Sequence, residues 1–444
     1  MSKKQVHLAA HFPGVNNTTV WSDPESGSQT DFSSFVHFAQ TAERGLFDFL
    51  FLAEGLRLRE HRGRIHDLDV VGRPDTFTVL NAIAAVTTHL GLGGTINTTF
   101  NEPYELARQF ASLDHLSGGR AAWNLVTSSD AFTGENFRRG GFLDPSDRYE
   151  RAGDILAAAK ELWLSAGEEV RHTSAQFDFH GRFTLPPTPQ GHPVLIQSGD
   201  SDQGREFGAA TADAIFSRHS TIEAGQEFYR NMKDRLPRYG RTDADLTILP
   251  AATFVIGDTA ADAEEKAQHV RRAQVSPQTA IAFLEQVWGR DLSAYDPDGP
   301  LPDPDPDPEA ASITRGRVRH EKDTLKVAND WRDLAASTKG SAPGGGLTIR
   351  ELIIETTARQ SFVGTPAQVA AQIDDAVQAD ASDGFILIPH LVPGGLDEFV
   401  AAVVPELQDR GAYRTAYAGT TLRDHLGLRR PTTAEVADTT RRSA

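Results

Sequence analysis

LFDFLFLA (46–53) and LGLGGTIN (90–97) are two short apolar runs, and DTFTVLNAIAAVTT (75–88) lies between them. Apolar runs of this length that lack polar alternation predict strands buried on both faces, as in a parallel sheet. The intervening segment predicts a helix, because Asp75 or Thr76 is placed to cap its first turn. Strand, helix and strand in this order indicate an α/β fold.

The same alternation extends in both directions from this unit. Further strands are predicted at 6–11, 121–126, 193–197, 214–217, 246–256 and 384–388. Helices are predicted at 31–44, 102–116, 148–164, 203–212, 223–239, 260–275 and 396–410. Eight strands fit either a doubly wound sheet or a closed barrel, and the count of eight favours the barrel. We therefore predict an α/β fold, a (β/α)8 TIM barrel that spans residues 1–444 as a single domain.

Three stretches, at about 127–147, 166–192 and 289–350, do not fit the repeat. We expect them to be insertions on the catalytic face of the barrel. In the second of them, QFDFHGRFTL (176–185) predicts a strand, a glycine turn and another strand. In the third, the prolines of PDGPLPDPDPDP (297–308) exclude a helix or a central strand and predict an extended, exposed loop. This loop is either a lid or a disordered insertion.

The composition excludes several classes of protein. The absence of cysteine excludes disulfides, thiolate catalysis, iron–sulfur clusters and cysteine-based zinc sites. A formal net charge of −17 argues against nucleic acid or an anionic membrane as a partner. No apolar run approaches the roughly 20 residues that span a bilayer, and the sequence starts without a signal peptide pattern. We expect a cytoplasmic enzyme without a membrane partner.

Active sites of such barrels gather where the strands end, so the residues that follow each strand are candidates. They are His11, Glu54, Thr98, Thr99, Thr127, Ser128, Ser201, Arg218, His219 and His390. The set is rich in hydroxyl groups and poor in paired carboxylates, which disfavours glycoside hydrolysis. A metal hydrolase is also disfavoured, because His7 and His11 lie too far apart along a strand to replace a His-x-His pair. We expect no metal site.

GDSDQGREFGAA (199–210) joins the fifth predicted strand to its helix. A small hydroxyl residue beside glycines at a helix N-terminus offers backbone N–H groups and the positive end of the helix dipole, which suit a phosphate. Ser201 is equally compatible with a simple helix cap.

A resemblance to a known family rests on six stretches. They are FLAE (51–54), TINTTFNEPYELARQFASLDHLSGGRAAWNLVTS (95–128), RYERAGDILAAAKELW (148–163), IQSGDSDQGREF (196–207), FVGTPAQVAAQI (362–373) and TTLRDHLGL (420–428). Together they resemble the reduced-flavin-dependent monooxygenases of the bacterial luciferase superfamily. The nearest branch is that of the nitrilotriacetate and dibenzothiophene-sulfone monooxygenases, and the match covers nearly the whole chain in order.

The resemblance implies a (β/α)8 barrel that binds FMNH2 supplied by a separate NAD(P)H:FMN reductase. In this family O2 forms a flavin C4a-(hydro)peroxide, which transfers one oxygen atom to a small organic substrate at a C–S, C–N or related bond. The protein holds the flavin, excludes water and places the substrate. Relatives form homodimers or homotetramers. The alternatives are an F420-dependent oxidoreductase of the same superfamily and a non-catalytic flavin-binding barrel.

The resemblance also implies roles for individual residues. The cofactor-binding positions of the family correspond here to Glu54, Thr98, Thr99, Asn124, Thr127, Tyr149, Gly199 and Ser201. The resemblance implies that Glu54 lies near the flavin ring, that the threonine pair contacts the isoalloxazine, and that Asn124 and Thr127 line the pocket. The last three positions are implied to hold the flavin phosphate.

Two positions depart from the pattern of the family. Pro145 stands where relatives commonly have histidine, and Asp200 stands where they often have serine. A carboxylate beside a phosphate repels it unless the carboxylate is turned away or paired. The phosphate contact is then expected to depend on Ser201 and Tyr149, with Arg138 or Arg139 as a further candidate.

His11 is the candidate catalytic residue, because it follows the first strand at the expected substrate end of the cleft. If its imidazole faces the reactive edge of the flavin, it can stabilise the oxygenated cofactor or move a proton.

Overall fold

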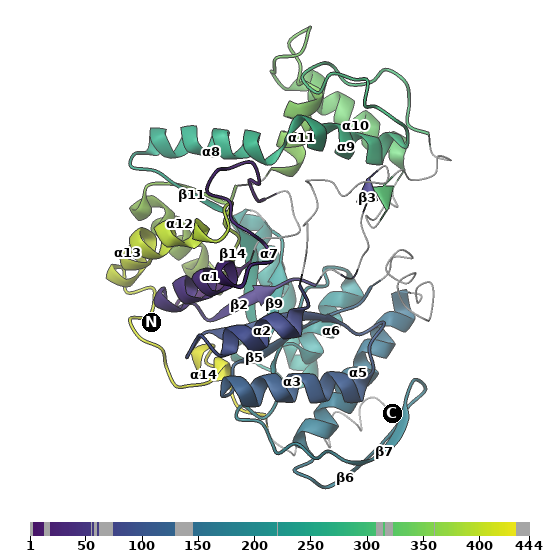
Figure 1. The fold of residues 1–444 in the computed structure, drawn as a ribbon, viewed down its shortest axis with the longest axis vertical. Helices are drawn as coiled ribbons and strands as arrows, with labels where there is room; N and C mark the ends of the chain where they lie inside the picture. Colours follow the sequence, from purple (N-terminus) through teal and green to yellow (C-terminus); the bar gives the residue numbers. More distant parts are fainter. Residues whose placement is uncertain are drawn as a thin grey trace.

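The computed structural model describes residues 3–12, 18–54, 56, 60–61, 74–128, 145–219, 221–307, 314–315, 323–358 and 360–431. Its centre is a closed barrel of eight parallel strands in the order β1-β14-β10-β9-β8-β5-β4-β2 (Figure 1). These strands are β1 His7–His11, β2 Phe49–Leu52, β4 Gly91–Asn97, β5 Ala121–Val126, β8 Val194–Gln197, β9 Ala214–Ser217, β10 Thr247–Ala252 and β14 Gly384–Leu387. The predicted (β/α)8 barrel is confirmed.

Helices cover the outside of the barrel, and most begin at a residue that caps them. They are α1 Phe32–Arg44, α2 Thr76–Ala84, α3 Pro103–Ser117, α5 Pro145–Leu164, α6 Asp202–Thr211, α7 Ile222–Lys233, α8 Ala260–Gln274, α12 Pro366–Gln378 and α13 Val404–Asp409. The Asp75 carboxylate accepts from the Thr78 amide at 2.8 Å, as the sequence predicts. The helix predicted at 223–239 is wrong at its end, because Leu236–Tyr239 forms a separate 3₁₀ turn that contains Pro237.

Barrel closure joins the first and the last barrel strand. His7 pairs with Gly384, and Ala10 pairs with Leu387. A Cβ atom at Gly384 would lie 1.8 Å from the carbonyl oxygen of His7, so only glycine permits this approach of the two strands.

The chain between β10 and β14 differs from the prediction. The strand predicted at 246–256 breaks at Thr253, and its second part, β11 (Phe254–Ile256), leaves the barrel to pair with β13 (Phe362–Gly364). Helices α9 (Pro277–Trp288), α10 (Thr324–Ser337) and α11 (Ile349–Thr357) follow α8 and form an additional layer beyond the barrel (Figure 1). The layer has its own apolar core around Trp288.

The proline-rich segment packs on this layer. Residues 297–307 contain no helix or strand, as predicted, but they are not a free loop. Arg332 of α10 donates to the carbonyl oxygens of Pro302, Asp303 and Pro304 at 3.0–3.2 Å, and the Trp288 indole donates to Pro304 at 2.8 Å. The expectation of a fully exposed loop is therefore wrong for this part of the insertion.

The hairpin predicted in 166–192 exists, but its register and position differ from the prediction. β6 (Glu169–Thr173) pairs with β7 (Asp178–Arg182), so Gly181 lies within a strand opposite Val170 rather than in the turn. The hairpin joins the end of α5 to the start of β8 and lies at the opposite end of the molecule from α9–α11 (Figure 1). It is not on the catalytic face. Of the insertion at 127–147, residues 129–144 lie outside the described residues.

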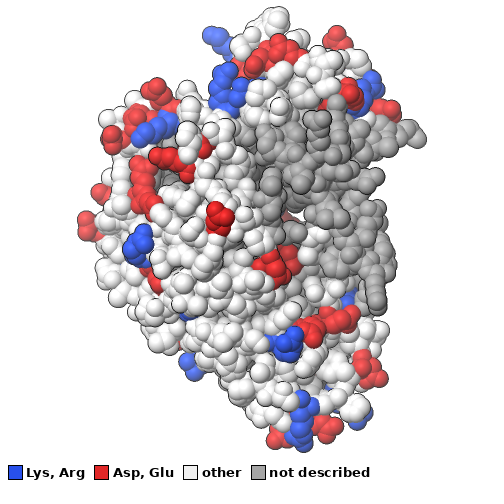
Figure 2. All heavy atoms as spheres, viewed as in Figure 1, with Lys and Arg blue, Asp and Glu red and all other residues white. Residues whose placement is uncertain are grey.

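Two very short strands, β3 (Glu60–His61) and β12 (Thr314–Arg315), form a separate antiparallel pair. In the described ranges, no helix is long and apolar enough to cross a membrane. Acidic and basic side chains are interspersed on the face shown in Figure 2.

The amino end of the barrel is closed by α14 (Leu422–His425), the helix of the stretch TTLRDHLGL. Leu422, Leu426 and Leu428 pack with the inward-facing strand residues Ala9 and Phe49. Below them, Arg423 forms an ion pair with Asp213, and Arg414 forms one with Asp48.

His425 of α14 makes this closure sensitive to acid. Burial lowers the pKa of its imidazole to about 4, against about 6.5 for an exposed histidine. The unfolded chain therefore takes up the proton first, and the stability contributed by the neutral ring is complete above pH 6.5 and lost as the pH falls toward 4.

We expect the free energy of unfolding to fall by about 1–2 kcal/mol from this group between pH 7 and pH 5. Urea unfolding at both pH values measures the loss. His425→Phe keeps a ring beside Tyr417 but cannot titrate. In this variant the free energy of unfolding should fall by about 1–2 kcal/mol less between pH 7 and pH 5 than in the wild type. An unchanged decrease would show that other groups cause it.

Candidate active site

A cavity of about 1040 Å³ opens at the carboxyl ends of the barrel strands. Six barrel strands contribute residues to it, which include His11, Phe51, Thr95, Asn124, Phe216 and Ala251, and the residues that directly follow β8 and β14, Ser198 and Ile388, complete the ring. Helices α8 and α11 supply the outer wall, with Arg271 and Gln274 from the first and Glu355 and Thr357 from the second. The cavity therefore lies where the sequence predicts the active site.

The lining includes a row of aromatic rings. The imidazole of His11 lies 5.3 Å from the ring of Phe51, and Phe51 stacks on Phe216 at 5.3 Å with an angle of 26° between the planes. Flat apolar surfaces of this kind favour a planar aromatic ligand. Glu54 stands beside this row, where its Oε2 accepts from the Asn97 amide at 3.0 Å.

Asn124 presents a buried acceptor to the cavity. Its Nδ2 donates to Thr95 Oγ1 at 2.9 Å, whereas its Oδ1 has no hydrogen-bond partner in the described part of the chain. The residue is only 3% exposed. A buried carbonyl oxygen without a donor is costly, so a ligand that offers an N–H group there would be stabilised.

Tyr149, Gly199 and Ser201 come together at the start of α6. The Ser201 hydroxyl caps this helix by accepting from the Gly204 amide at 3.1 Å. A Cβ atom at either Gly199 or Gly204 would lie 2.8 Å from the Tyr149 hydroxyl, and one at Gly204 would also lie 2.9 Å from the backbone of Gly199. The two glycines thus let a hydroxyl and a helix N-terminus share one small space beside the cavity residue Ser198, which suits a phosphate.

Asp200 is turned away from this space. Its side chain is 73% exposed and forms an ion pair with Arg205 at 2.8 Å. Because the Asp200 carboxylate is paired and exposed to solvent, it would not repel a phosphate bound at the start of α6. Arg138 and Arg139 lie outside the described residues, and of the side chain at Pro145 the structure describes nothing.

The predicted threonines do not line the described cavity wall. The Thr98 hydroxyl is buried and donates to the Val126 carbonyl at 3.1 Å, and Thr99 Oγ1 accepts from the Ser128 amide at 3.1 Å. Neither these two nor Thr127 is among the described residues that line the cavity. Their predicted flavin contacts stay predictions.

Thr95 lines the cavity instead and is not among the residues predicted from the sequence. Every second side chain of a strand points to the same face, so this period of two along β4 was the signal that could have found Thr95. Phe51 and Phe216, which form the aromatic row, were missed because apolar strand residues look like ordinary core.

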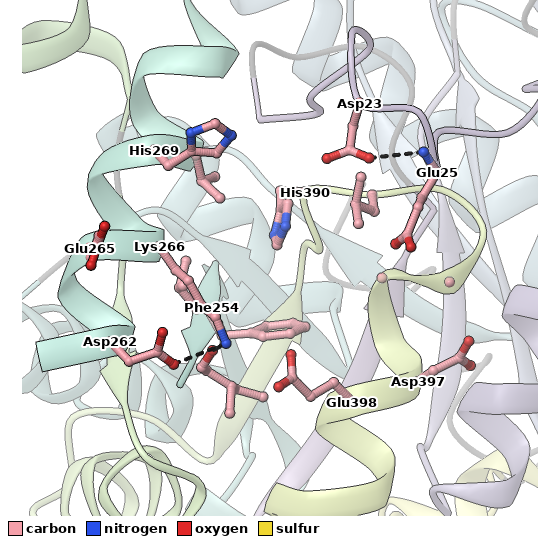
Figure 3. A pocket seen from close by; sticks show the side chains of 16 residues that line it. Asp23, Glu25, Phe254, Asp262, Glu265, Lys266, His269, His390, Asp397 and Glu398 are labelled. Atoms are coloured by element: carbon pink, nitrogen blue, oxygen red, sulfur yellow. Dashed lines mark hydrogen bonds and ion pairs between the residues drawn. The ribbon is translucent and has the colours of Figure 1, made fainter. Parts of the chain in front are cut away.

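The strand-end histidines differ in position. His219 lines the main cavity, and burial lowers the pKa of its imidazole. His390 instead lines a second cavity of about 740 Å³ beyond α8, shown in Figure 3. Lys266 and the carboxylates of Asp23, Glu25, Asp262, Glu265, Asp397 and Glu398 surround it. The structure therefore separates His390 from the other candidates. Within the described ranges, no three histidine or carboxylate side chains converge to hold a metal ion.

Known proteins share this architecture. The chain is 36% identical over 433 residues to nitrilotriacetate monooxygenase component A of Aminobacter aminovorans, which covers 90% of this chain and 91% of that protein. It is 36% identical over 455 residues to N-acetyl-S-(2-succino)cysteine monooxygenase of Bacillus subtilis (strain 168), covering 97% and 98%. The crystal structure of a riboflavin lyase with modified FMN and riboflavin matches with a TM-score of 0.77, at 28% identity over 98% of this chain and 99% of that one.

A family profile matches most of the chain as one continuous stretch. Residues 15–383 match the profile described as luciferase-like monooxygenase. The matched residues include six of the eight barrel strands, which are β2, β4, β5, β8, β9 and β10. They also include α6 and the cavity lining except His11 and Ile388. The chain belongs to the luciferase-like monooxygenase family.

Proposed function

We propose that this protein is a monooxygenase that uses FMNH2 and O2 to oxygenate a small organic substrate. The observation that carries the proposal is the convergence of Tyr149, Gly199 and Ser201 on one small space at the N-terminus of α6, beside a cavity with an aromatic row. A flavin mononucleotide combines a planar ring system with a phosphate, and these two features fit that pair of surfaces. The modified FMN in the related riboflavin lyase supports a flavin.

The residues would divide the work of binding. Ser201, Tyr149 and the first amides of α6 would hold the phosphate, while Asn124 Oδ1 would accept a hydrogen bond from the ring system. Phe51 and Phe216 would exclude water from the space beside the ring. Reduced FMN, when bound, supplies the electrons that activate O2. We also place Glu54, Thr98, Thr99 and Thr127 in the flavin site, as the resemblance implies.

The electrons must come from outside this chain in the proposed reaction. We propose a separate NAD(P)H:FMN reductase as the source, with the flavin passing between the two proteins. The designation of one relative as component A supports such a division into two proteins. A homodimer or homotetramer is the proposed assembly.

His11 is the proposed proton-handling residue, because its ring lies in the cavity beside Phe51. We expect His11→Ala to release at least about threefold more hydrogen peroxide per FMNH2 consumed, because a lost proton donor diverts oxygen from the substrate. Peroxide is measured by a coupled peroxidase assay with a compound that the wild type oxygenates. The control is His390→Ala, in the second cavity, which should leave the ratio unchanged. An unchanged ratio in His11→Ala would remove His11 from this role.

The first test of the function is an anaerobic titration of the protein with FMNH2 and, separately, with reduced F420. Mixing each complex with O2 in a stopped-flow spectrophotometer then reports whether oxygen reacts on the protein. Binding of FMNH2 followed by an oxygen-dependent absorbance transient supports the monooxygenase. Binding of F420 alone, without reaction with oxygen, would replace it with a hydride-transfer enzyme. Flavin binding without turnover of any substrate would indicate a non-catalytic barrel.

A further inference from the structure

Arg218 lies on the cavity wall, and the residues next to it are held in place by contacts. It directly follows β9 and lines the cavity. Its neighbour His219 is held on both sides, since Nε2 donates to the Ala381 carbonyl at 3.1 Å and Nδ1 lies 3.3 Å from the Ser217 hydroxyl. The His219 ring also packs against Phe228, 5.5 Å away. The backbone on either side of Arg218 is therefore fixed, while its own side chain is exposed to the cavity.

The guanidinium of Arg218 has no partner among the described residues. In the part of the chain that the structure describes, it makes no hydrogen bond and no ion pair, although the protein carries a net charge of −17. The carboxylates that line the same cavity are each engaged with a donor. Glu54 accepts from Asn97, Glu264 from Gln268 and Glu355 from Arg271, at 3.0, 3.3 and 2.9 Å.

Among the described residues, Arg218 is thus a charged side chain of this cavity lining whose own hydrogen-bonding groups remain unused. A guanidinium has five N–H donors in a planar fork, which binds an oxyanion with two parallel hydrogen bonds. That oxyanion has two possible sources, the phosphate of the flavin and a carboxylate of the substrate. The phosphate already has donors at α6, namely the Ser201 hydroxyl, the Tyr149 hydroxyl and the helix N-terminus.

We propose that Arg218 binds a carboxylate of the substrate, so that the substrates of this enzyme are small carboxylic acids. The proposal rests on the function proposed above and names the substrate class of the same cavity. Arg218 then fixes the orientation of the acid and selects against neutral analogues, because a neutral group leaves the guanidinium without a counter-charge.

The test measures binding of diacids and matched neutral compounds by calorimetry. The probes are succinate, glutarate and iminodiacetate, each compared with its diamide, on the FMN-loaded and the flavin-free protein. In Arg218→Met we expect the dissociation constant of the preferred diacid to rise about tenfold or more, with a smaller rise in Arg218→Lys, which keeps the charge but loses the fork. Arg171→Met is the matched control, because it removes the same charge from an exposed residue of β6.

The outcomes separate this proposal from the proposed function. Dissociation constants of FMN and of riboflavin, which lacks the phosphate, should stay within about twofold of wild type in Arg218→Met. A variant that loses affinity for FMN but keeps it for riboflavin would assign the guanidinium to the flavin phosphate and overturn the proposal. Wild-type protein that binds diacids no more tightly than diamides would overturn it too. Failure of the wild type to bind any flavin would overturn the proposed function, whereas the flavin-free measurements would still decide the role of Arg218.

Discussion

The Gly204→Ala variant is expected to bind FMNH2 about a hundredfold more weakly than the wild type, which corresponds to about 2.7 kcal/mol. An alanine Cβ at this position would lie 2.8 Å from the Tyr149 hydroxyl and 2.9 Å from the backbone of Gly199. Atoms do not approach so closely, so the methyl group must displace both the tyrosine and the loop that carries Gly199. The space at the start of α6 then no longer has the shape for a phosphate.

A second glycine offers a matched control for this substitution. Gly153 also lies in a helix, α5, but a Cβ atom there meets nothing within 4 Å. Gly153→Ala should leave flavin affinity unchanged and raise stability by about 0.5–1 kcal/mol, as alanine does in helices. Fluorescence titration with FMN and riboflavin measures the effects. Gly204→Ala should weaken FMN much more than riboflavin, and equal affinities in variant and wild type would place the phosphate elsewhere.

Replacing Arg423 with methionine is expected to lower the free energy of unfolding by about 3–5 kcal/mol. Arg423 is 2% exposed, and its guanidinium lies 2.9 Å from Asp213 Oδ2 and 3.0 Å from His192 Nδ1. Burial by itself raises the pKa of the Asp213 carboxyl, but Arg423, His192 and the hydrogen bond from the Leu195 amide together outweigh burial and lower this pKa to about 2. Without the arginine, the Asp213 carboxylate loses its counter-charge. An ionised carboxylate that is largely buried and unpaired then destabilises the folded state.

Urea unfolding at pH 7 measures this loss, followed by circular dichroism. Arg423→Met with Asp213→Asn should recover part of the stability, because the double variant leaves no unpaired charge. The control is Lys326→Met, which breaks an exposed ion pair with Asp330 and should cost about 0.5 kcal/mol or less. If Arg423→Met costs no more than this control, α14 does not hold the amino end of the barrel closed.

The barrel was predictable from the sequence because its strands are buried on both faces. A run such as LFDFLFLA can be little else when helices flank it, and β2 lies inside that run. The break at Thr253 was not predictable, because it depends on hydrogen bonds to Ser361, more than a hundred residues away. The layer of α9–α11 was missed although Thr348 and Glu351 form a capping box at the start of α11. The prolines of residues 297–308 exclude a helix there, and the predicted loop was extended to residue 350.

The candidate site was predictable where a local motif sets the geometry. Gly199 and Ser201 stand at a strand-to-helix turn, and that turn also fixes how they meet Tyr149. Thr98 and Thr99 follow a strand end in the sequence, but they are not among the described residues that line the cavity. Beyond Asn97 the chain turns, and the hydroxyls of both threonines bond to the backbone of the β5 end. Which hydroxyl faces a ligand therefore depends on a turn that the sequence does not mark.

The pairing of β1 with β14 has a consequence for how the protein is made. On a ribosome β1 emerges early, but its partner follows only after nearly all the other strands. Until then the edges of β1 and β10 stay unpaired, and open strand edges recruit other chains. α14 leaves the exit tunnel later still. The barrel therefore closes only after β14 has emerged, and until then the nascent chain depends on chaperones to shield these two edges.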